Sequence, residues 1–286
     1  MKVLLYENHT ESRSIAKQFD LPQSTVWICF ERTIKALSSI ADNFINWPSR
    51  EKRQVIENGF NNKSKLQGVI GAIDGTYIAI KAPRENPEVY INRKCYYAIT
   101  LQAVCDNKRQ FMDVFVGYPS SVSDRRIFVN SDLYRNVTTN VAEYFDENQF
   151  ILGDKAYPNL KWILSPYIDR GHLQERHKNF NKCHASTRSV VERSFALLFG
   201  RFRRLKYLDM CRMDLIPKTV LAACVLHNIC LMFADQQEQY YVQEGREFLD
   251  QRQARDNVNL EQYNEGVMVA DGNARREIIA QNLPRH

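Results

Sequence analysis

The sequence lacks the features that mark several large classes of protein. It has no run of about 18 apolar residues, the length that a membrane-spanning helix needs, so no membrane association is expected. Its first residues hold one Lys and a very short apolar run, which is too little for a signal peptide. No Gly-x-Gly-x-x-Gly, Gly-Lys-Ser/Thr or Gly-x-Ser-x-Gly segment occurs, and this argues against dinucleotide-binding, P-loop and esterase chemistry.

A regular cysteine pattern is also missing. The seven cysteines are an odd number, their spacing is scattered and no Cys-x-x-Cys occurs, so reduced thiols in the cytosol or nucleus are expected rather than a disulfide framework. His172, His177, Cys183 and His184 leave two alternatives, a zinc site or a polar loop that leads into the next helix. Their spacing fits no structural zinc pattern, and this favours the loop.

Acidic residues are scarce in the body of the chain. The net charge is +6, but residues 231–286 contain ten acidic and six basic residues and therefore carry −4. The first 230 residues hold 33 basic and 23 acidic residues, a net charge of +10. Between Arg176 and Lys206 nine Lys and Arg accompany a single acid, Glu192. A body of this kind suggests a polyanionic partner such as DNA, and a solvated surface is the alternative.

Residues 1–62 carry helical periodicity. A short helix is expected near 12–19, a turn at 20–22, and a second helix from Gln23 that continues until Trp47-Pro48 stops it. Two interpretations remain open, a helix-turn-helix or a plain helical pair packed on the next domain. In the first, four side chains would approach base edges: Gln23, Ser24, Thr25 and Trp27.

The pattern changes to strands at Gly68. β-rich runs cover 69–73 and 77–80, two further strands fit 96–104 and 111–116 with a turn at 106–108 between them, and a buried strand fits 150–152. Helical patterns follow at 187–205 and at about 217–233, and the chain is polar from 234 onward. We therefore expect a helical region at 1–62, a main domain at 63–232 and a polar C-terminal tail at 233–286.

Three carboxylates stand at positions where they could meet. Asp74 lies 80 residues before Asp154, and Glu192 lies 38 residues after it. Each has a structural alternative: a hairpin turn at Asp74-Gly75, a helix cap or Asx turn at Asp154, and an ion pair between Glu192 and Arg188 at i−4. Phosphodiester cleavage with two divalent metals needs converging carboxylates, since Mg²⁺ prefers hard oxygen ligands.

Five ordered blocks together resemble the PIF/Harbinger family of DDE transposases. They are Ile-Gly-Ala-Ile-Asp-Gly-Thr-Tyr-Ile (70–78), Ser-Val-Ser-Asp-Arg-Arg-Ile-Phe (121–128), Leu-Gly-Asp-Lys-Ala-Tyr-Pro (152–158), Val-Val-Glu-Arg-Ser-Phe-Ala-Leu-Leu-Phe-Gly-Arg-Phe-Arg-Arg-Leu (190–205) and Ala-Ala-Cys-Val-Leu-His-Asn-Ile-Cys (222–230). The resemblance covers about residues 65–232.

The resemblance implies an α/β fold with an RNase H-like mixed sheet flanked by helices. It assigns the catalytic, metal-binding triad to Asp74, Asp154 and Glu192, with Mg²⁺ or Mn²⁺ as cofactor, and makes Asp124 a further candidate ligand. Domesticated members of this family are similar to this chain in sequence. The resemblance therefore implies a location in nucleus and cytoplasm and a Myb/SANT-like partner for DNA binding and nuclear import.

Basic residues near the triad are candidates for contacts with DNA phosphates. Lys155 follows the second aspartate directly, where many relatives carry a small residue. The others lie within or just after the glutamate helix: Arg193, Arg201, Arg203 and Arg204.

Three functions are compatible with these observations. The first is a metal-dependent DNA nuclease or transposase, the second a domesticated DNA-binding or scaffold protein without cleavage activity, and the third a module whose basic helix binds an acidic protein. The complete triad favours the first.

Overall fold

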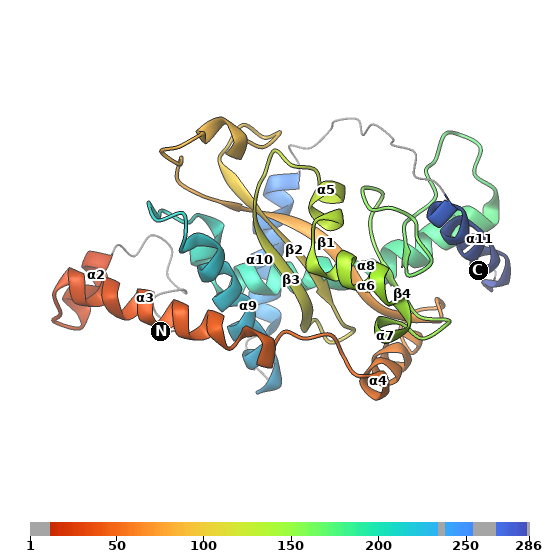
Figure 1. Cartoon of the computed structure of the whole chain (residues 1–286), viewed down its shortest axis with the longest axis horizontal. Helices are drawn as coiled ribbons and strands as arrows, with labels where there is room; N and C mark the ends of the chain where they lie inside the picture. The colour runs from red at the N-terminus through yellow and green to blue at the C-terminus, as the bar shows by residue number, and fades with distance from the viewer. Residues whose placement is uncertain (1–11, 234–237, 254–266, 285–286) are drawn as a thin grey trace.

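A mixed five-stranded sheet forms the centre of the computed structural model, which describes residues 12–233, 238–253 and 267–284 (Figure 1). The strand order is β3-β2-β1-β4-β5. β1, β2 and β3 form an antiparallel meander, whereas β4 runs parallel to β1 and β5 parallel to β4. The strand bounds are β1 Val69–Ala79, β2 Ala98–Cys105, β3 Phe111–Pro119, β4 Phe150–Leu152 and β5 Ile163–Leu164. The expected α/β class with a mixed sheet and flanking helices is confirmed.

β1 is one continuous strand. Asp74 pairs with Ala103 and Gly75 with Gln102 in the antiparallel ladder to β2. The hairpin alternative at Asp74-Gly75 is therefore wrong. The apolar, β-branched residues on either side of this dipeptide bury in the sheet and override the local turn preference.

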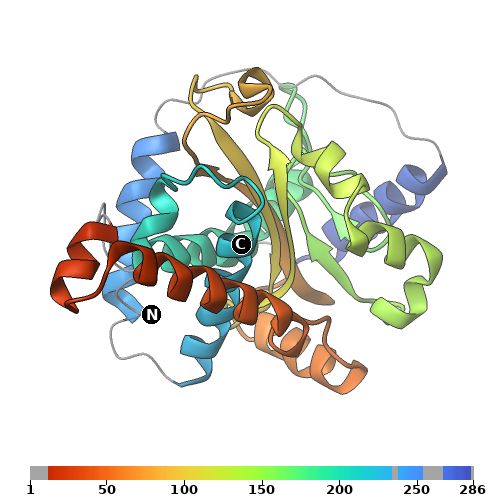
Figure 2. The same cartoon turned by 60° about the vertical axis from the view of Figure 1, so that its left-hand side comes forward.

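Helices cover both faces of the sheet (Figure 2). α8 packs against β1 and β2 and α9 against β3, while α5 contacts β2 and lies with α6 and α7 over the opposite face. None of the described helices is long and apolar enough to cross a bilayer. The helix bounds are α2 Ser12–Gln18, α3 Gln23–Ser39, α4 Arg50–Asn61, α5 Asp124–Val129, α6 Asp132–Thr139, α7 Val141–Tyr144, α8 Glu175–Arg201, α9 Ile216–Met232, α10 Glu238–Gln253 and α11 Val267–Asn282.

The N-terminal helices join the main core. α3 ends at Ser39, earlier than expected, and a short 3-10 turn at Ala41–Asn43 follows it. The hydroxyls of Ser38 and Ser39 donate hydrogen bonds to backbone carbonyl oxygens of the last turns, which helps to end the helix there. Phe30 and Ile34 of α3 belong to the same hydrophobic cluster as the sheet, and the separate cluster within the described residues 12–62 is small, with Ile15, Ala16 and Val26.

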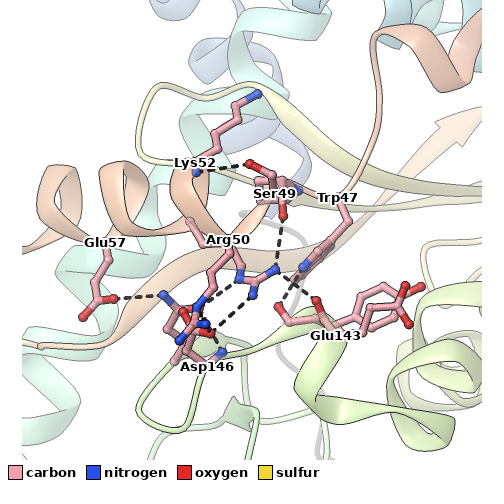
Figure 3. A network of polar contacts seen from close by, with 11 residues as sticks. Trp47, Ser49, Arg50, Lys52, Glu57, Glu143 and Asp146 are labelled. Carbon is pink, nitrogen blue, oxygen red and sulfur yellow. Dashed lines mark hydrogen bonds and ion pairs between the residues drawn. The ribbon is translucent and has the colours of Figure 1, made fainter.

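A polar network fastens α4 to the segment before β4 (Figure 3). The buried Arg53 guanidinium donates to Gln149 Oε1 at 3.1 Å and to the Glu143 carbonyl oxygen at 3.0 Å. Gln149 donates in turn to Glu57 Oε2 at 3.1 Å. Ser49 caps the helix, since its hydroxyl accepts from the Lys52 backbone N–H. These contacts hold α4 beside β1 and the start of β4.

The region predicted as a polar tail contains two packed helices. α10 lies against α8, and α11 contacts both α8 and β5. A Cβ at Gly200 would collide with the Tyr241 carbonyl oxygen, and one at Gly245 with the Ala196 carbonyl oxygen. Glycines thus allow two helix backbones to touch. The tail interpretation is wrong for these two helices. Their polar composition misled it, because helices that cross this closely need few apolar side chains to pack. Another part of the predicted tail, 254–266, lies outside the described residues.

Candidate active site

The two aspartates are positioned by neighbouring parallel strands. Ala72 of β1 pairs with Leu152 of β4, so Asp74 and Asp154 each lie two residues beyond a paired position. The carboxyl ends of adjacent parallel strands meet at the same edge, which brings distant side chains together. Asp154 Oδ1 also accepts from the Ala156 N–H at 2.9 Å, so the predicted Asx turn is present and orients the carboxylate.

Arg188 of α8 joins the first and third carboxylates. Its Nη1 donates to Asp74 Oδ2 at 2.9 Å, and its Nη2 donates to Glu192 Oε1. The predicted i,i+4 ion pair with Glu192 is therefore confirmed, and the same guanidinium reaches β1. Glu192 is the more accessible acid, with 44% of its side chain exposed against 20% for Asp74. One cation thus holds two of the three proposed ligands in the same place.

The carboxyl groups of Asp74 and Asp154 both have raised pKa values. Burial, opposed by the Arg188 cation and reinforced by the charges of Asp154 and Asp124, raises the pKa of Asp74 to about 7. Burial also raises the pKa of Asp154, against hydrogen bonding from the Ala156 N–H and the attraction of Arg188. Perturbed carboxyl groups in a cluster are typical of sites that bind cations or transfer protons.

Asp124 approaches the site from the other face of the sheet. It begins α5, whose N-cap hydroxyl is that of Ser123. A Cβ at position 75 would lie 2.6 Å from Asp124 Oδ1, so only Gly75 leaves room for this carboxylate. Burial, together with the Asp154 charge, raises the pKa of Asp124 to about 6. Successive residues of a strand face opposite sides, so Asp124 lies on the Gly75 side and Arg188 on the Asp74 side.

A divalent cation fits the chemistry of these donors. All the candidate ligands are carboxylates, which Mg²⁺ and Mn²⁺ prefer, and a bound cation would offset the burial and the repulsion that together raise the pKa of Asp74. Within 12–233, 238–253 and 267–284, no three His, Cys, Asp or Glu side chains lie close enough together to bind one ion. Arg188 supplies the positive charge between Asp74 and Glu192 in this arrangement.

Tyr157 and Gln102 support the site without any clear signal in the sequence. The buried Tyr157 hydroxyl donates to Gln102 Oε1 at 3.3 Å, and its ring packs edge-on against Phe128 of α5. Burial and, after it, the charges of the three aspartates raise the pKa of Tyr157. Tyr157 lies three residues after Asp154, but nothing in the local sequence shows that it would turn inward.

The histidines and the cysteine considered for zinc have other surroundings. His177 stacks on Tyr167, and its Nε2 lies 3.0 Å from Glu277 Oε2. His184 is buried with its Nε2 3.1 Å from the Leu164 carbonyl oxygen. No zinc site forms in the described part of the chain. The alternative is also corrected, since His177, Cys183 and His184 belong to α8 rather than to a loop.

Arg201 is the clearest correction among the predicted phosphate contacts. It is 0% exposed, and its guanidinium lies near His227 and over the Tyr241 ring, 5.9 Å from the ring centroid. A side chain enclosed in this way does not reach DNA. The prediction fails because charge alone indicates a surface position, whereas the packing of α9 and α10 encloses the side chain.

The remaining predicted contacts differ in their environments. Arg203 donates to Glu244 Oε2 at 2.6 Å, so α10 neutralises it. Arg204 lies over the Phe30 ring at 5.4 Å. Arg193 is half-buried and donates to Ser189 Oγ at 3.0 Å. Lys155 is exposed beside Asp154. Arg193 and Lys155 are therefore the two best placed for contact with phosphates near the acids.

The segment that carries this geometry matches a known family. Residues 73–228 match the model of the DDE superfamily endonucleases. The chain belongs to that superfamily. It is 30% identical over 217 residues to "Putative nuclease HARBI1" of Rattus norvegicus, which covers 74% of this chain, and 29% identical over 234 residues to "Protein ALP1-like" of Arabidopsis thaliana, which covers 78%.

These matches confirm the resemblance to the Harbinger-derived DDE family. The chain spans 60% of the rat relative and 57% of the Arabidopsis relative. No solved structure matches the chain at a significant level. The sequence motifs thus assign the chain to its family, whereas the geometry of the site is known only from the fold of this chain.

Proposed function

We propose that this protein is a divalent-metal-dependent endonuclease that acts on DNA, derived from or acting as a Harbinger-type transposase. The observation that carries the proposal is the Arg188 guanidinium, which contacts both Asp74 and Glu192, while burial and then the charges of Asp154 and Asp124 raise the pKa of Asp74. Arg188 thereby joins acids of two elements that are far apart in the sequence. Such convergence is what phosphodiester chemistry at paired metals requires.

Each acid has a definite role in this proposal. Asp74, Asp154 and Glu192 would hold Mg²⁺ or Mn²⁺, with Asp124 as a further oxygen donor, and the metals would polarise the phosphodiester and supply an activated water. The Ala156 N–H fixes the direction of the Asp154 carboxylate. Arg188 keeps Asp74 and Glu192 close together, and the buried Tyr157 excludes water from the side of α5.

The architecture supports an RNase H-like assignment. A meander of three antiparallel strands extended by two parallel strands, with one acid on β1, one just beyond β4 and one on a later helix, is the order that this assignment needs. We also propose that α2 and α3 form a helix-turn-helix, since Gln23 and Ser24 are exposed at the start of α3. Trp27 packs on the core and is the weakest of the expected base contacts.

The test is metal-dependent nicking of supercoiled DNA. Asp154→Asn keeps the size of the side chain but removes a ligand charge, so we expect nicking in Mg²⁺ or Mn²⁺ to fall by about 100-fold or more. Asp250→Asn, an exposed acid on α10, is the matched control and should retain activity. Full nicking by Asp154→Asn would refute the assignment.

A DNA-binding or scaffold function without cleavage is the second candidate. It is favoured by one observation, namely that Arg188 already balances Asp74 and Glu192 and no three ligands are assembled for an ion in the described residues. Salt-dependent DNA binding together with no nicking in either metal would support this function over the first.

A further inference from the structure

Three arginines from three separate elements lie around the part of α8 that follows Glu192. Arg193 lies on α8, Arg109 at the turn between β2 and β3, and Arg246 on α10. α10 packs on α8 with Gly245 at the Ala196 carbonyl oxygen, and the Phe111 ring just after the turn lies 6.1 Å from the Phe195 ring, so all three arginines start near the same part of α8. In keeping with this placement, burial and then the charges of Arg109 and Arg246 lower the pKa of Arg193. We refer to Arg109, Arg193 and Arg246 as the arginine cluster. Like charges brought together in this way lower stability unless an anion compensates them.

The backbone around the arginine cluster is firmly held. Gly245 brings α10 against the Ala196 carbonyl oxygen, and Arg246 is the next residue. Arg193 is one turn before Ala196 on α8 and donates to Ser189 Oγ at 3.0 Å. Arg109 adopts a left-handed backbone conformation (φ 70°), and its carbonyl oxygen lies 2.9 Å from His227 Nε2. A non-glycine residue in this conformation is strained and is retained only where its surroundings hold it.

The cluster is only partly neutralised. Arg109 forms an ion pair with Glu238 of α10. Glu192 attracts Arg193 but also pairs with Arg188. Arg246 is exposed, and its guanidinium makes no ion pair with any carboxylate of the described segments. Among the residues that the structure describes, the guanidinium groups of Arg193 and Arg246 therefore have little negative charge to balance them.

We propose that the arginine cluster binds a backbone phosphate of a DNA strand, so that a neighbouring phosphodiester lies at the carboxylates. Guanidinium groups match phosphate oxygens in geometry and remain charged at all relevant pH values. The identity of the ligand as DNA rests on the proposed function. In this view α10 contributes Arg246 to the substrate site, whereas Arg201 and Arg203 pack against α10 and Arg204 packs against Phe30 of α3.

Salt-dependent binding to a DNA duplex tests the proposal. The whole chain is titrated with duplex in EDTA, which prevents cleavage, at several salt concentrations. For Arg193→Gln/Arg246→Gln we expect the slope of log affinity against log salt to decrease by about 0.9 for each phosphate that the variant no longer neutralises. Lys63→Gln/Lys218→Gln removes two exposed charges elsewhere and should leave the slope near that of the wild type. Equal slopes for wild type and the arginine variant would overturn the proposal.

Thermal unfolding with sulfate separates free anions from DNA. Arg246→Gln relieves repulsion, so in low salt its Tm should equal or exceed that of the wild type, and sulfate should raise its Tm less. A cluster-dependent sulfate effect with an unchanged DNA slope would indicate a free-anion site and overturn the assignment to DNA. Cluster-dependent DNA binding without nicking in Mg²⁺ or Mn²⁺ would support the cluster and refute the endonuclease function. An unchanged slope with normal nicking would refute the role of the cluster and support the endonuclease function.

Discussion

Arg188 places one guanidinium between two carboxylates that belong to different elements, Asp74 on β1 and Glu192 on α8. In the sequence it is the i−4 partner of Glu192 and so a structural alternative to metal binding. In the fold the ion pair with Glu192 forms, and the same guanidinium also reaches Asp74. An ion pair along a helix is worth little at a surface, but here 18% of the Arg188 side chain is exposed and its partner on β1 is largely buried.

Loss of Arg188 should destabilise the protein when no metal is present. In Arg188→Gln the Asp74 carboxylate loses its nearest cation while still facing Asp154 and Asp124, so we expect the free energy of unfolding in EDTA to fall by about 1–3 kcal/mol. Chemical denaturation measures this change. Arg126→Gln, an exposed arginine on α5, is the control, and an equal decrease in both variants would contradict the role of Arg188.

The buried side chain of His227 should make the stability of the fold decrease at acidic pH. Burial and the neighbouring Arg201 cation, against a hydrogen bond to the Arg109 carbonyl oxygen, lower the pKa of His227 to about 3 from its ordinary value of 6.5. Between these values the unfolded chain binds a proton that the folded chain does not. Stability from this group is therefore complete above pH 6.5 and is lost as the pH falls towards 3.

The slope of stability against pH tests this role. Below pH 6.5, His227→Gln should reduce the slope by up to about 1.4 kcal/mol per pH unit, the value for one proton. His172→Gln changes an exposed histidine and serves as the control. If denaturation at pH 7 and pH 5 gave the same slope for wild type and His227→Gln, the buried histidine would not be the cause.

At the scale of elements, the crossing of α8 and α10 depends on the absence of side chains. Gly200 faces Tyr241, and Gly245 faces Ala196, with the backbones too close for any Cβ. Phe199 and Phe248 then meet beside the crossing, with ring centroids 5.1 Å apart. α10 is thereby fixed where Glu244 can pair with Arg203 and Lys206.

Gly245→Ala should disrupt this crossing. Alanine normally stabilises a helix relative to glycine by up to about 1 kcal/mol, but here its Cβ would meet the Ala196 carbonyl oxygen, so we expect a net decrease in stability of about 1–3 kcal/mol. Thermal or chemical unfolding gives the change. Gln243→Ala, on the exposed side of α10, is the control, and stabilisation by both substitutions would show that the two helices do not touch.

At the scale of the whole molecule, segments from both ends of the chain complete the domain. α3 and α4 contribute Phe30 and Ile56 to the core that contains the sheet, and α11 contributes Ala280. The polar network of Arg53, the ion pair of Glu277 with Arg176 and the hydrogen bond between Glu277 and His177 hold these segments in place. The packed core therefore includes segments outside the 63–232 range of the expected main domain.

Removal of residues 234–286 should expose α8 and prevent cooperative folding. A chain of residues 1–233 lacks the partners of Phe199 and Arg203, so we expect a broad, low-temperature unfolding transition and aggregation. Differential scanning calorimetry and size-exclusion chromatography measure both effects. A truncated protein that unfolds as sharply, and at the same Tm, as the full chain would show that α10 and α11 add nothing to the fold.

The sequence by itself determined the strands of the meander, the strand before Asp154, the amphipathic glutamate helix and the family motifs. These depend on residue type and short-range periodicity, which are properties of contiguous segments. It could not determine which arginines remain accessible, that Arg188 reaches β1, or that a polar tail would hold two packed helices. Those depend on burial and on pairing between segments more than 30 residues apart, such as Arg203 with Glu244 at a separation of 41 and Arg188 with Asp74 at 114. Only the packing of the whole chain brings such segments together.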